Sequence, residues 1–178
     1  MKYKTELISK EVVAEGTFAF HFKRPEGFEW RAGQSMDVTL IDPPETDGNN
    51  THAFSIVSAP HEETLTIATR LRGSAYKRVL ETADSGLEVE IEGPFGSFTL
   101  HENESRAAIM LVGGIGITPF ISMIKDATHK KLPHTIYLFY SNRRPEDTVY
   151  LEELRALAEE NEHFTLICTM TEIGRAHV

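Results

Sequence analysis

The stretch Leu111–Phe120, LVGGIGITPF, decides how the second half of this 178-residue chain folds. The apolar run Ala107–Val112 leads into it, and Pro119–Lys131, whose apolar residues have helical spacing, follows it. A strand, a glycine turn and a helix in this order provide free backbone N–H groups at a helix N-terminus, which can bind a pyrophosphate. The stretch therefore predicts a nucleotide-binding turn.

The glycines and the proline of this stretch have separate expected roles. Gly113, Gly114 and Gly116 lack a Cβ atom where the backbone must turn tightly or approach a ligand. Thr118 is expected to cap the helix, and Pro119 suits its first position. Because the spacing Gly114-x-Gly116-x-x-Pro119 differs from G-x-G-x-x-G, a turn that binds no ligand is the alternative.

The rest of the second half alternates between strand and helix patterns. Two further apolar runs, Thr135–Tyr140 and Phe164–Thr169, flank a helical pattern over Pro145–Glu160. This β-α-β-α-β order predicts a parallel sheet, and the continuous run Ala107–Val112 is typical of a strand buried on both faces. Three strands and two helices make half of a doubly wound sheet, so we expect a partial one over residues 107–171.

Residues 1–101 have the pattern of an all-β domain. Turn signals separate short β-like runs at Thr17–Lys23, Ser35–Ile41, Phe54–Val57, Leu65–Ala68 and Leu87–Ile91. One helix is expected at Ser74–Thr82, with Ser74 as its N-cap. The pattern predicts an antiparallel barrel or sandwich, joined to the second half by the polar linker His101–Arg106.

The last seven residues, Glu172–Val178 (EIGRAHV), resemble the translation of a common short-read sequencing adapter. We expect residues 172–178 to be a read-through artefact and the chain to be a fragment of a longer protein. A missing fourth strand would leave Ala107–Val112 as a bare apolar edge, which predicts poor solubility.

Composition excludes several classes of function. The net charge of −9 disfavours nucleic acid and anionic membrane surfaces as partners. No apolar run approaches the ~20 residues of a membrane helix, and the N-terminus lacks the apolar core of a signal peptide, so we expect a cytoplasmic protein. The single cysteine, Cys168, excludes a disulfide framework and a cysteine-ligated iron–sulfur cluster, and is expected to lie buried in a strand. No metal-ligand spacing occurs.

The residues after the second strand of the α/β half bear on cofactor choice. A dinucleotide site commonly has a carboxylate there, about 20 positions after the glycines, which binds a ribose 2′-hydroxyl. Here the sequence is Ser141-Asn142-Arg143-Arg144. Serine and arginine favour a 2′-phosphate, and therefore NADPH over NADH, although a solvated loop is the alternative.

Three stretches of the first half sharpen the interpretation: His52–Ser55 (HAFS), Thr69–Lys77 (TRLRGSAYK) and Gly93–Phe98 (GPFGSF). Together with the glycine turn, and in this order, they resemble the ferredoxin–NADP reductase-like flavoenzyme family from the start of the chain to about Thr171. The resemblance implies an antiparallel Greek-key FAD-binding barrel over residues 1–101, followed by half of an NAD(P)-binding domain over 107–171. FAD and NADPH (or NADH) are the implied cofactors.

The resemblance also implies residue roles. Phe54 would lie against the flavin, and Ser55, the residue assigned to catalysis, would hydrogen-bond its ring. His52 stands where the family has arginine, so FAD would bind less tightly or FMN would compete, with Arg70 or Lys77 replacing some of the charge. The full set of implied cofactor-binding residues is His52, Ala53, Phe54, Ser55, Thr69, Arg70, Leu71, Gly73, Ser74 and Lys77 in the barrel, and Gly114, Gly116, Thr118, Pro119, Ser141, Asn142 and Arg143 in the α/β half.

The function implied is that of a flavin-dependent oxidoreductase, which passes a hydride from NAD(P)H to FAD and electrons onward. The acceptor, a ferredoxin, a flavodoxin or a fused iron–sulfur domain, is not specified by the sequence. The family's Cys-Gly-Pro-type motif is absent, so the fragment is expected to be an impaired reductase. The alternatives are a flavin-binding electron-transfer or regulatory module without its own NAD(P)H oxidation, and a protein that binds no flavin.

Overall fold

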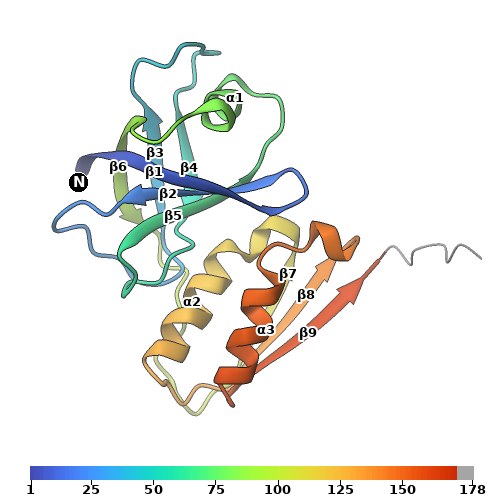
Figure 1. Cartoon of the computed structure of the whole chain (residues 1–178). Coiled ribbons are helices and arrows are strands. Elements are labelled where there is room, and N and C mark those ends of the chain that lie inside the picture. Colours follow the sequence, from blue (N-terminus) through green and yellow to red (C-terminus); the bar gives the residue numbers. More distant parts are fainter. Residues whose placement is uncertain (172–178) are drawn as a thin grey trace, which may run out of the picture.

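The computed structural model describes residues 1–171, which form a six-stranded antiparallel sheet followed by a three-stranded parallel sheet with helices (Figure 1). The expected combination of an antiparallel barrel and a partial α/β sheet is confirmed. The elements in chain order are β1 (Lys2–Ala14), β2 (Thr17–Lys23), β3 (Ser35–Leu40), β4 (Thr51–Ser55), β5 (Thr64–Arg70), α1 (Ala75–Thr82), β6 (Glu88–Phe95), β7 (Ala108–Gly113), the 3-10 turn η1 (Gly114–Ile117), α2 (Thr118–His129), β8 (Ile136–Asn142), η2 (Pro145–Asp147), α3 (Leu151–Glu160) and β9 (Phe164–Met170).

The first sheet has the strand order β4-β3-β6-β1-β2-β5 and closes into a barrel. Val57, just after β4, donates its N–H to the carbonyl of Thr66 on β5 at 2.8 Å. This hydrogen bond joins the two end strands of the sheet, β4 and β5. Alternation along the strands directs Phe20, Phe22 and Ile67 into the barrel core, where all are fully buried. The barrel, meaning β1–β6 and α1, therefore has a hydrophobic core of its own.

Helix α1 packs on this barrel through its buried face, which includes Tyr76, Val79 and Leu80. The Ser74 side chain accepts a hydrogen bond from the Lys77 N–H at 3.3 Å, so the expected N-cap is confirmed. Strand β1 was not expected from the sequence. Its side chains are mostly exposed, and Leu7 is its one buried residue.

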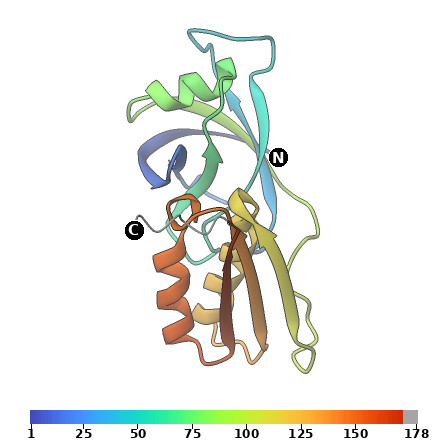
Figure 2. The ribbon, with the colours of Figure 1, turned by 90° about the vertical axis from the view of Figure 1, so that its right-hand side faces the viewer.

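The second sheet has the order β7-β8-β9, and all its strands are parallel. Helices α2 and α3 lie on the same face of this sheet (Figure 2). Met110 and Leu138 are therefore buried, whereas their neighbours Ile109 and Leu111 are 67% and 71% exposed. The expectation that Ala107–Val112 is buried on both faces is wrong, because no described element covers the second face.

The barrel and the α/β half, meaning β7–β9 with α2 and α3, share a second hydrophobic core. Ala19, Val57 and Ala68 of the barrel are buried in the same cluster as Ile117 and Ile121 of the α/β half. Figure 1 shows α2 running directly beneath the barrel. This contact brings the glycine turn to the barrel surface.

Polar contacts also join the two parts. The Ser122 hydroxyl donates to the Ser58 carbonyl at 2.8 Å. Lys125, whose side chain is 15% exposed, forms ion pairs with Glu62 of the barrel at 3.4 Å and with Glu153 of α3 at 2.8 Å. A mostly buried ammonium group between two carboxylates fixes the barrel against both helices of the α/β half.

Candidate functional site

The glycine turn connects β7 to α2 through η1. Gly114 has a φ of +53°, and a Cβ atom built there would meet no atom within 4 Å. A Cβ at Gly116 would lie 3.3 Å from the Val112 side chain. Gly116 therefore allows the turn η1 to pack closely on strand β7. Gly114 leaves open space beside the backbone, which a bound ligand requires.

The start of α2 differs from the expectation. Its N-cap is Ile117, no side chain caps it, and Thr118 is already helical. The Thr118 hydroxyl donates to the Ile115 carbonyl at 3.3 Å, so the expected capping by Thr118 is wrong, and Pro119 is the second rather than the first residue of the helix. The physical reason is the extra 3-10 turn, which moves the helix start. The first N–H groups of α2 are thus left without a side-chain acceptor.

Residues 141–144 follow at the carboxyl end of the neighbouring strand. Ser141 pairs with Gly113 across the parallel ladder, and Asn142 is buried. Arg143 is exposed. Arg144 contacts Glu15 at 2.9 Å and Asp147 at 3.2 Å, and these carboxylates raise its pKa. Two carboxylates thus hold Arg144.

The expected flavin motif lies on β4, with Ala53 exposed and Ser55 half-buried. The His52 ring stacks on Tyr76, with ring centroids 4.1 Å apart and 25° between the planes, and Phe54 lies 6.0 Å from the same ring. The Tyr76 hydroxyl donates to the Val38 carbonyl at 3.0 Å, and burial raises its pKa. His52 is therefore part of an aromatic cluster between β4 and α1.

The segment after β5 leads into α1. Thr69 is buried and Leu71 packs against the barrel core. Gly73 has a φ of +45°, with open space where a Cβ would lie. The Lys77 ammonium donates to the Arg70 carbonyl at 2.8 Å, and its pKa is lowered by burial and by the charge of Arg72. The backbone at Gly73 and the capped start of α1 thus offer an approach for a ligand.

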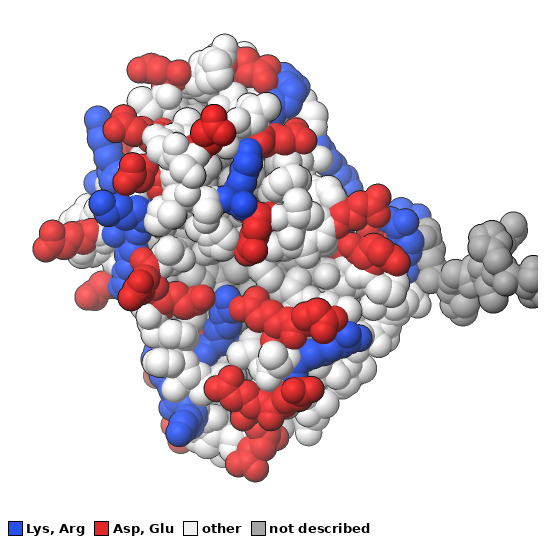
Figure 3. Space-filling view, in the orientation of Figure 1, with Lys and Arg blue, Asp and Glu red and all other residues white. Residues whose placement is uncertain are grey.

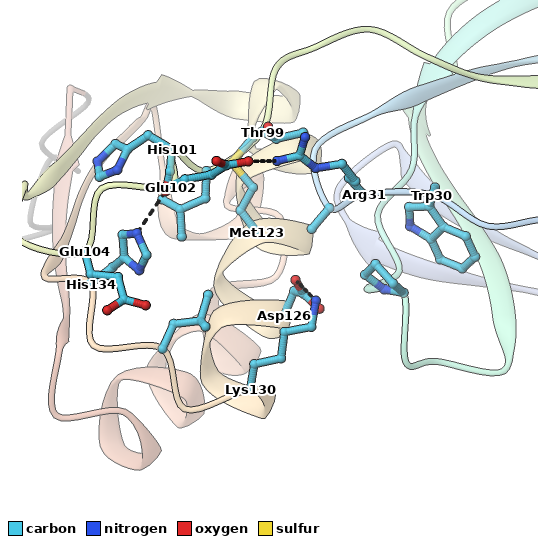
Figure 4. A pocket seen from close by; sticks show the side chains of 14 residues that line it. Trp30, Arg31, Thr99, His101, Glu102, Glu104, Met123, Asp126, Lys130 and His134 are labelled. Carbon is cyan, nitrogen blue, oxygen red and sulfur yellow. Dashed lines mark hydrogen bonds and ion pairs between the residues drawn. The ribbon is translucent and has the colours of Figure 1, made fainter.

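The structure also contains a cavity that the sequence did not indicate. It has a volume of about 350 Å³ and lies between the barrel, the linker and α2 (Figure 4). His134 Nε2 is 2.9 Å from the His101 carbonyl, and Asp126 forms an ion pair with Lys130 at 2.8 Å. Its lining contains none of the expected cofactor residues and comes partly from loops and partly from α2, which contributes Met123 and Asp126.

Two further observations concern side-chain chemistry. Cys168 is exposed on β9, so the expectation that it is buried is wrong. Cys168 lies on β9, the outermost strand of the sheet, where neighbouring strands cover side chains on one side only.

No group of three or more His, Cys, Asp or Glu within residues 1–171 could hold a metal ion. No helix in that same range is long and apolar enough to cross a membrane.

Sequence comparisons match both parts of the chain. Residues 110–176 match the family model of the oxidoreductase NAD-binding domain. The chain is 28% identical over 180 residues to dual oxidase 2 of Sus scrofa, covering 93% of this chain and 12% of that protein. It is 24% identical over 149 residues to the reductase component of propane 2-monooxygenase from Rhodococcus jostii (strain RHA1), covering 83% of this chain and 40% of that protein. The chain thus spans only a small part of these relatives.

Solved structures share the fold. A cytochrome P450 reductase of Amycolatopsis superposes with a TM-score of 0.82 at 18% identity, covering 99% of this chain and 54% of that one. The ferredoxin–NADP+ reductase of Plasmodium falciparum superposes with a TM-score of 0.84 at 15% identity, covering 98% of this chain and 73% of that one. The chain therefore has the fold of a ferredoxin–NADP reductase, a barrel followed by a parallel sheet, and its residues 110–176 are similar to the oxidoreductase NAD-binding domain.

Proposed function

We propose that the chain is the FAD- and nucleotide-binding part of an NAD(P)H-dependent oxidoreductase, which passes a hydride from NAD(P)H to FAD and electrons onward. Residues 1–101 would bind FAD and residues 107–171 would form the first half of the NAD(P)-binding domain. The observation that carries the proposal is the contact between the glycine turn η1 and strand β5 of the barrel. This contact brings a nucleotide-type turn next to β5, whose last residues, Thr69 and Arg70, are among the expected flavin-binding residues.

The barrel residues fit a flavin. Phe54, which is half-buried and packs beside the buried Tyr76, gives an apolar aromatic side chain, and the open Cβ position of Gly73 at the start of α1 leaves room for a phosphate. Ser55 would donate a hydrogen bond to the flavin ring. His52 stacks on Tyr76 and lacks the permanent charge and the fork of donors of an arginine. We therefore infer weaker FAD binding than an arginine would give at this position.

The α/β residues fit a nicotinamide nucleotide. The open position beside Gly114, at the start of the turn η1 that runs into α2, suits a pyrophosphate. Gly116, Thr118 and Pro119 fix the backbone there. Ser141, Asn142 and Arg143, at the end of the adjacent strand, would contact the adenosine ribose or its 2′-phosphate.

A bound flavin would supply the redox chemistry, because it accepts two electrons with a hydride and can release electrons one at a time. The chain's own residues contribute binding, orientation and exclusion of water. The hydride step requires no general base from the protein. The packing of the barrel on α2 through Ser122, Lys125 and the shared apolar core would set the relative position of the two ligands.

The electron acceptor is proposed to be a protein or an iron–sulfur domain, since relatives of this chain include a P450 reductase and a monooxygenase reductase component. Asp and Glu outnumber Lys and Arg in the sequence, and Figure 3 shows them over the face that carries α2 and α3. This charge favours neither a nucleic acid nor an anionic membrane as partner. We also propose that the protein is cytoplasmic.

The experiment is a pair of titrations on the purified 178-residue chain. FAD fluorescence measures flavin binding, and the rate of NADPH oxidation with an artificial acceptor measures activity. We expect FAD to bind and NADPH oxidation to be slow. FAD binding without any nucleotide binding would favour an electron-transfer or regulatory module, and binding of neither ligand by folded protein would refute the proposal.

A further inference from the structure

The cavity between the barrel, the linker and α2 is surrounded by polar atoms that have no partner in the protein. Both ring nitrogens of His101, Nδ1 of His134 and Oδ1 of Asp126 are buried and make no hydrogen bond to any atom of residues 1–171. All three residues belong to the lining of this cavity. Because buried polar groups are costly to leave unpaired, this cluster indicates that a bound molecule completes their hydrogen bonding.

The contacts of His134 decide which kind of group it can bind. The residue is 4% exposed, and its Nε2 atom lies 2.9 Å from the His101 carbonyl, which can only accept a hydrogen bond. Nε2 must therefore carry a proton, and in a neutral imidazole Nδ1 is then a bare acceptor. His134 thus requires a hydrogen-bond donor from the molecule that fills the cavity.

The charges around the cavity favour a cation. Asp126 Oδ2 lies 2.8 Å from Lys130 Nζ, which leaves Oδ1 as a further acceptor. Arg31 pairs with Glu102 at 3.7 Å, so Glu104 is the carboxylate of the lining that has no basic partner there. The lining therefore offers a donor cation several acceptor atoms and one unbalanced negative charge.

The remaining walls of the cavity are apolar. They come from Trp30 and Pro60 of the barrel, Leu100 just before the linker, Met123 of α2 and Leu132 beyond that helix. The volume of about 350 Å³ is at the lower end of the range found for small-molecule sites. The space therefore suits a compact apolar body that carries a positively charged donor group.

We propose that this cavity binds a small organic ammonium ion, whose charged head donates to His134 Nδ1 and faces Glu104 while its body packs against the apolar walls. Figure 4 shows Glu104 and His134 on one side of the space and Asp126 on the other. Such a ligand contacts the barrel, the linker and α2 at once, and so strengthens the contact between the two halves. The cavity shares no lining residue with the expected FAD and nucleotide sites, so the inference does not depend on the proposed function.

The test uses Trp30 as reporter, because it is the single tryptophan of the chain and lines the cavity. Three probes of matched shape are titrated into the full chain at about pH 8, where free histidine is neutral and a primary amine is charged. They are phenethylamine, the neutral 2-phenylethanol and the anionic 3-phenylpropionate. We expect phenethylamine to change the Trp30 emission with a dissociation constant of about 1 mM. The alcohol should bind about tenfold more weakly, and the carboxylate should not bind.

Two variants and a control locate the charged head. His134→Gln keeps a donor for the His101 carbonyl but removes the free acceptor, and should weaken phenethylamine about tenfold. Glu104→Gln removes the charge of an exposed side chain, so it should weaken the probe about threefold and leave the urea midpoint unchanged. Glu159→Gln, exposed on α3, removes the same charge away from the cavity and should bind the probe like wild type.

Three results would overturn the inference. Unchanged Trp30 emission with every probe would mean that water alone fills the cavity and meets the free atoms. Equal affinity for the amine and either of the other two probes would show that the lining does not select a cation. Wild-type affinity for phenethylamine in both folded variants, His134→Gln and Glu104→Gln, would place the probe elsewhere. The proposed function is tested separately, by the titrations with FAD and NADPH.

Discussion

At the scale of single residues, the glycine turn depends on Gly114. A side chain in the left-handed region costs about 1 kcal/mol of stability, and at this site its methyl group would also enter the open space beside the turn. We expect Gly114→Ala to weaken NADPH binding at least tenfold, measured by calorimetry, with unchanged FAD binding.

The matched control for this variant is Gly27→Ala. Gly27 also has a positive φ, +75°, and open space at its Cβ position, but it lies in a barrel turn. Both variants should lose similar stability to urea. If both also lost NADPH affinity equally, the effect of Gly114→Ala would be one of folding, and the turn would have no special role in binding.

The pair His61 and His129 gives a pH dependence. Their rings stack with centroids 3.7 Å apart and 9° between planes, across the contact of barrel and α2. Burial lowers the pKa of His61, as do the charges of His129 and Lys125, while Glu62 and Asp126 act in the opposite direction. The folded state therefore binds a proton at His61 less readily than the unfolded chain does.

The direction in which stability changes with pH follows from the difference between the folded and unfolded pKa of His61. A group whose pKa is lowered on folding contributes stability above its unfolded pKa, about 6.5 for histidine, and this contribution is lost as the pH falls. We expect the urea midpoint of wild type to fall between about pH 7.5 and about pH 5.5 by more than that of His61→Phe, which keeps an aromatic ring. Because His61 is largely exposed, the difference is small. His163→Gln, at an exposed histidine away from this contact, should behave like wild type.

At the scale of elements, helix α1 has eight residues, and its first turn depends on one cap. Replacing an N-cap serine by alanine costs about 1 kcal/mol. Ser74→Ala should therefore lower the unfolding free energy by that amount in urea titrations and weaken FAD binding, because the helix start approaches the proposed phosphate. Ser9→Ala, at an exposed position of β1, should change neither. Unchanged stability in Ser74→Ala would contradict the capping geometry.

Most elements could be predicted from the sequence, since alternation and the glycine turn are local signals. Strand β1 could not, because its alternate residues are charged and exposed and its stability comes from pairing with β2 and β6. The start of α2 was displaced by the turn η1, which no residue pattern specifies. Whether the expected cofactor residues bind their ligands stays a prediction.

At the scale of the whole molecule, one face of the parallel sheet is apolar and exposed. Ile109 and Leu111 of β7 lie beside Tyr137 and Phe139 of β8 in register, and all four are at least 37% exposed. Contiguous apolar surface of this kind promotes association. The chain is therefore expected to self-associate at tens of micromolar in analytical ultracentrifugation.

The double variant Ile109→Thr, Leu111→Thr should reduce this association, since threonine keeps the strand preference while lowering the apolar area. Val12→Thr, at a 65% exposed position of β1, removes a comparable side chain outside the patch and should have no effect. A monomeric wild type at these concentrations would show that the exposed face does not act as an association surface.

The shared core has a consequence for the order of folding. Ala19, Val57 and Ala68 come from the barrel, yet they complete the cluster that holds α2 against the parallel sheet. The barrel has a separate core of its own, whereas the α/β half buries its helices partly on a surface that must already exist. The barrel would therefore act as a template during synthesis: it can condense first, and the β-α-β-α-β segment becomes stable only as it docks.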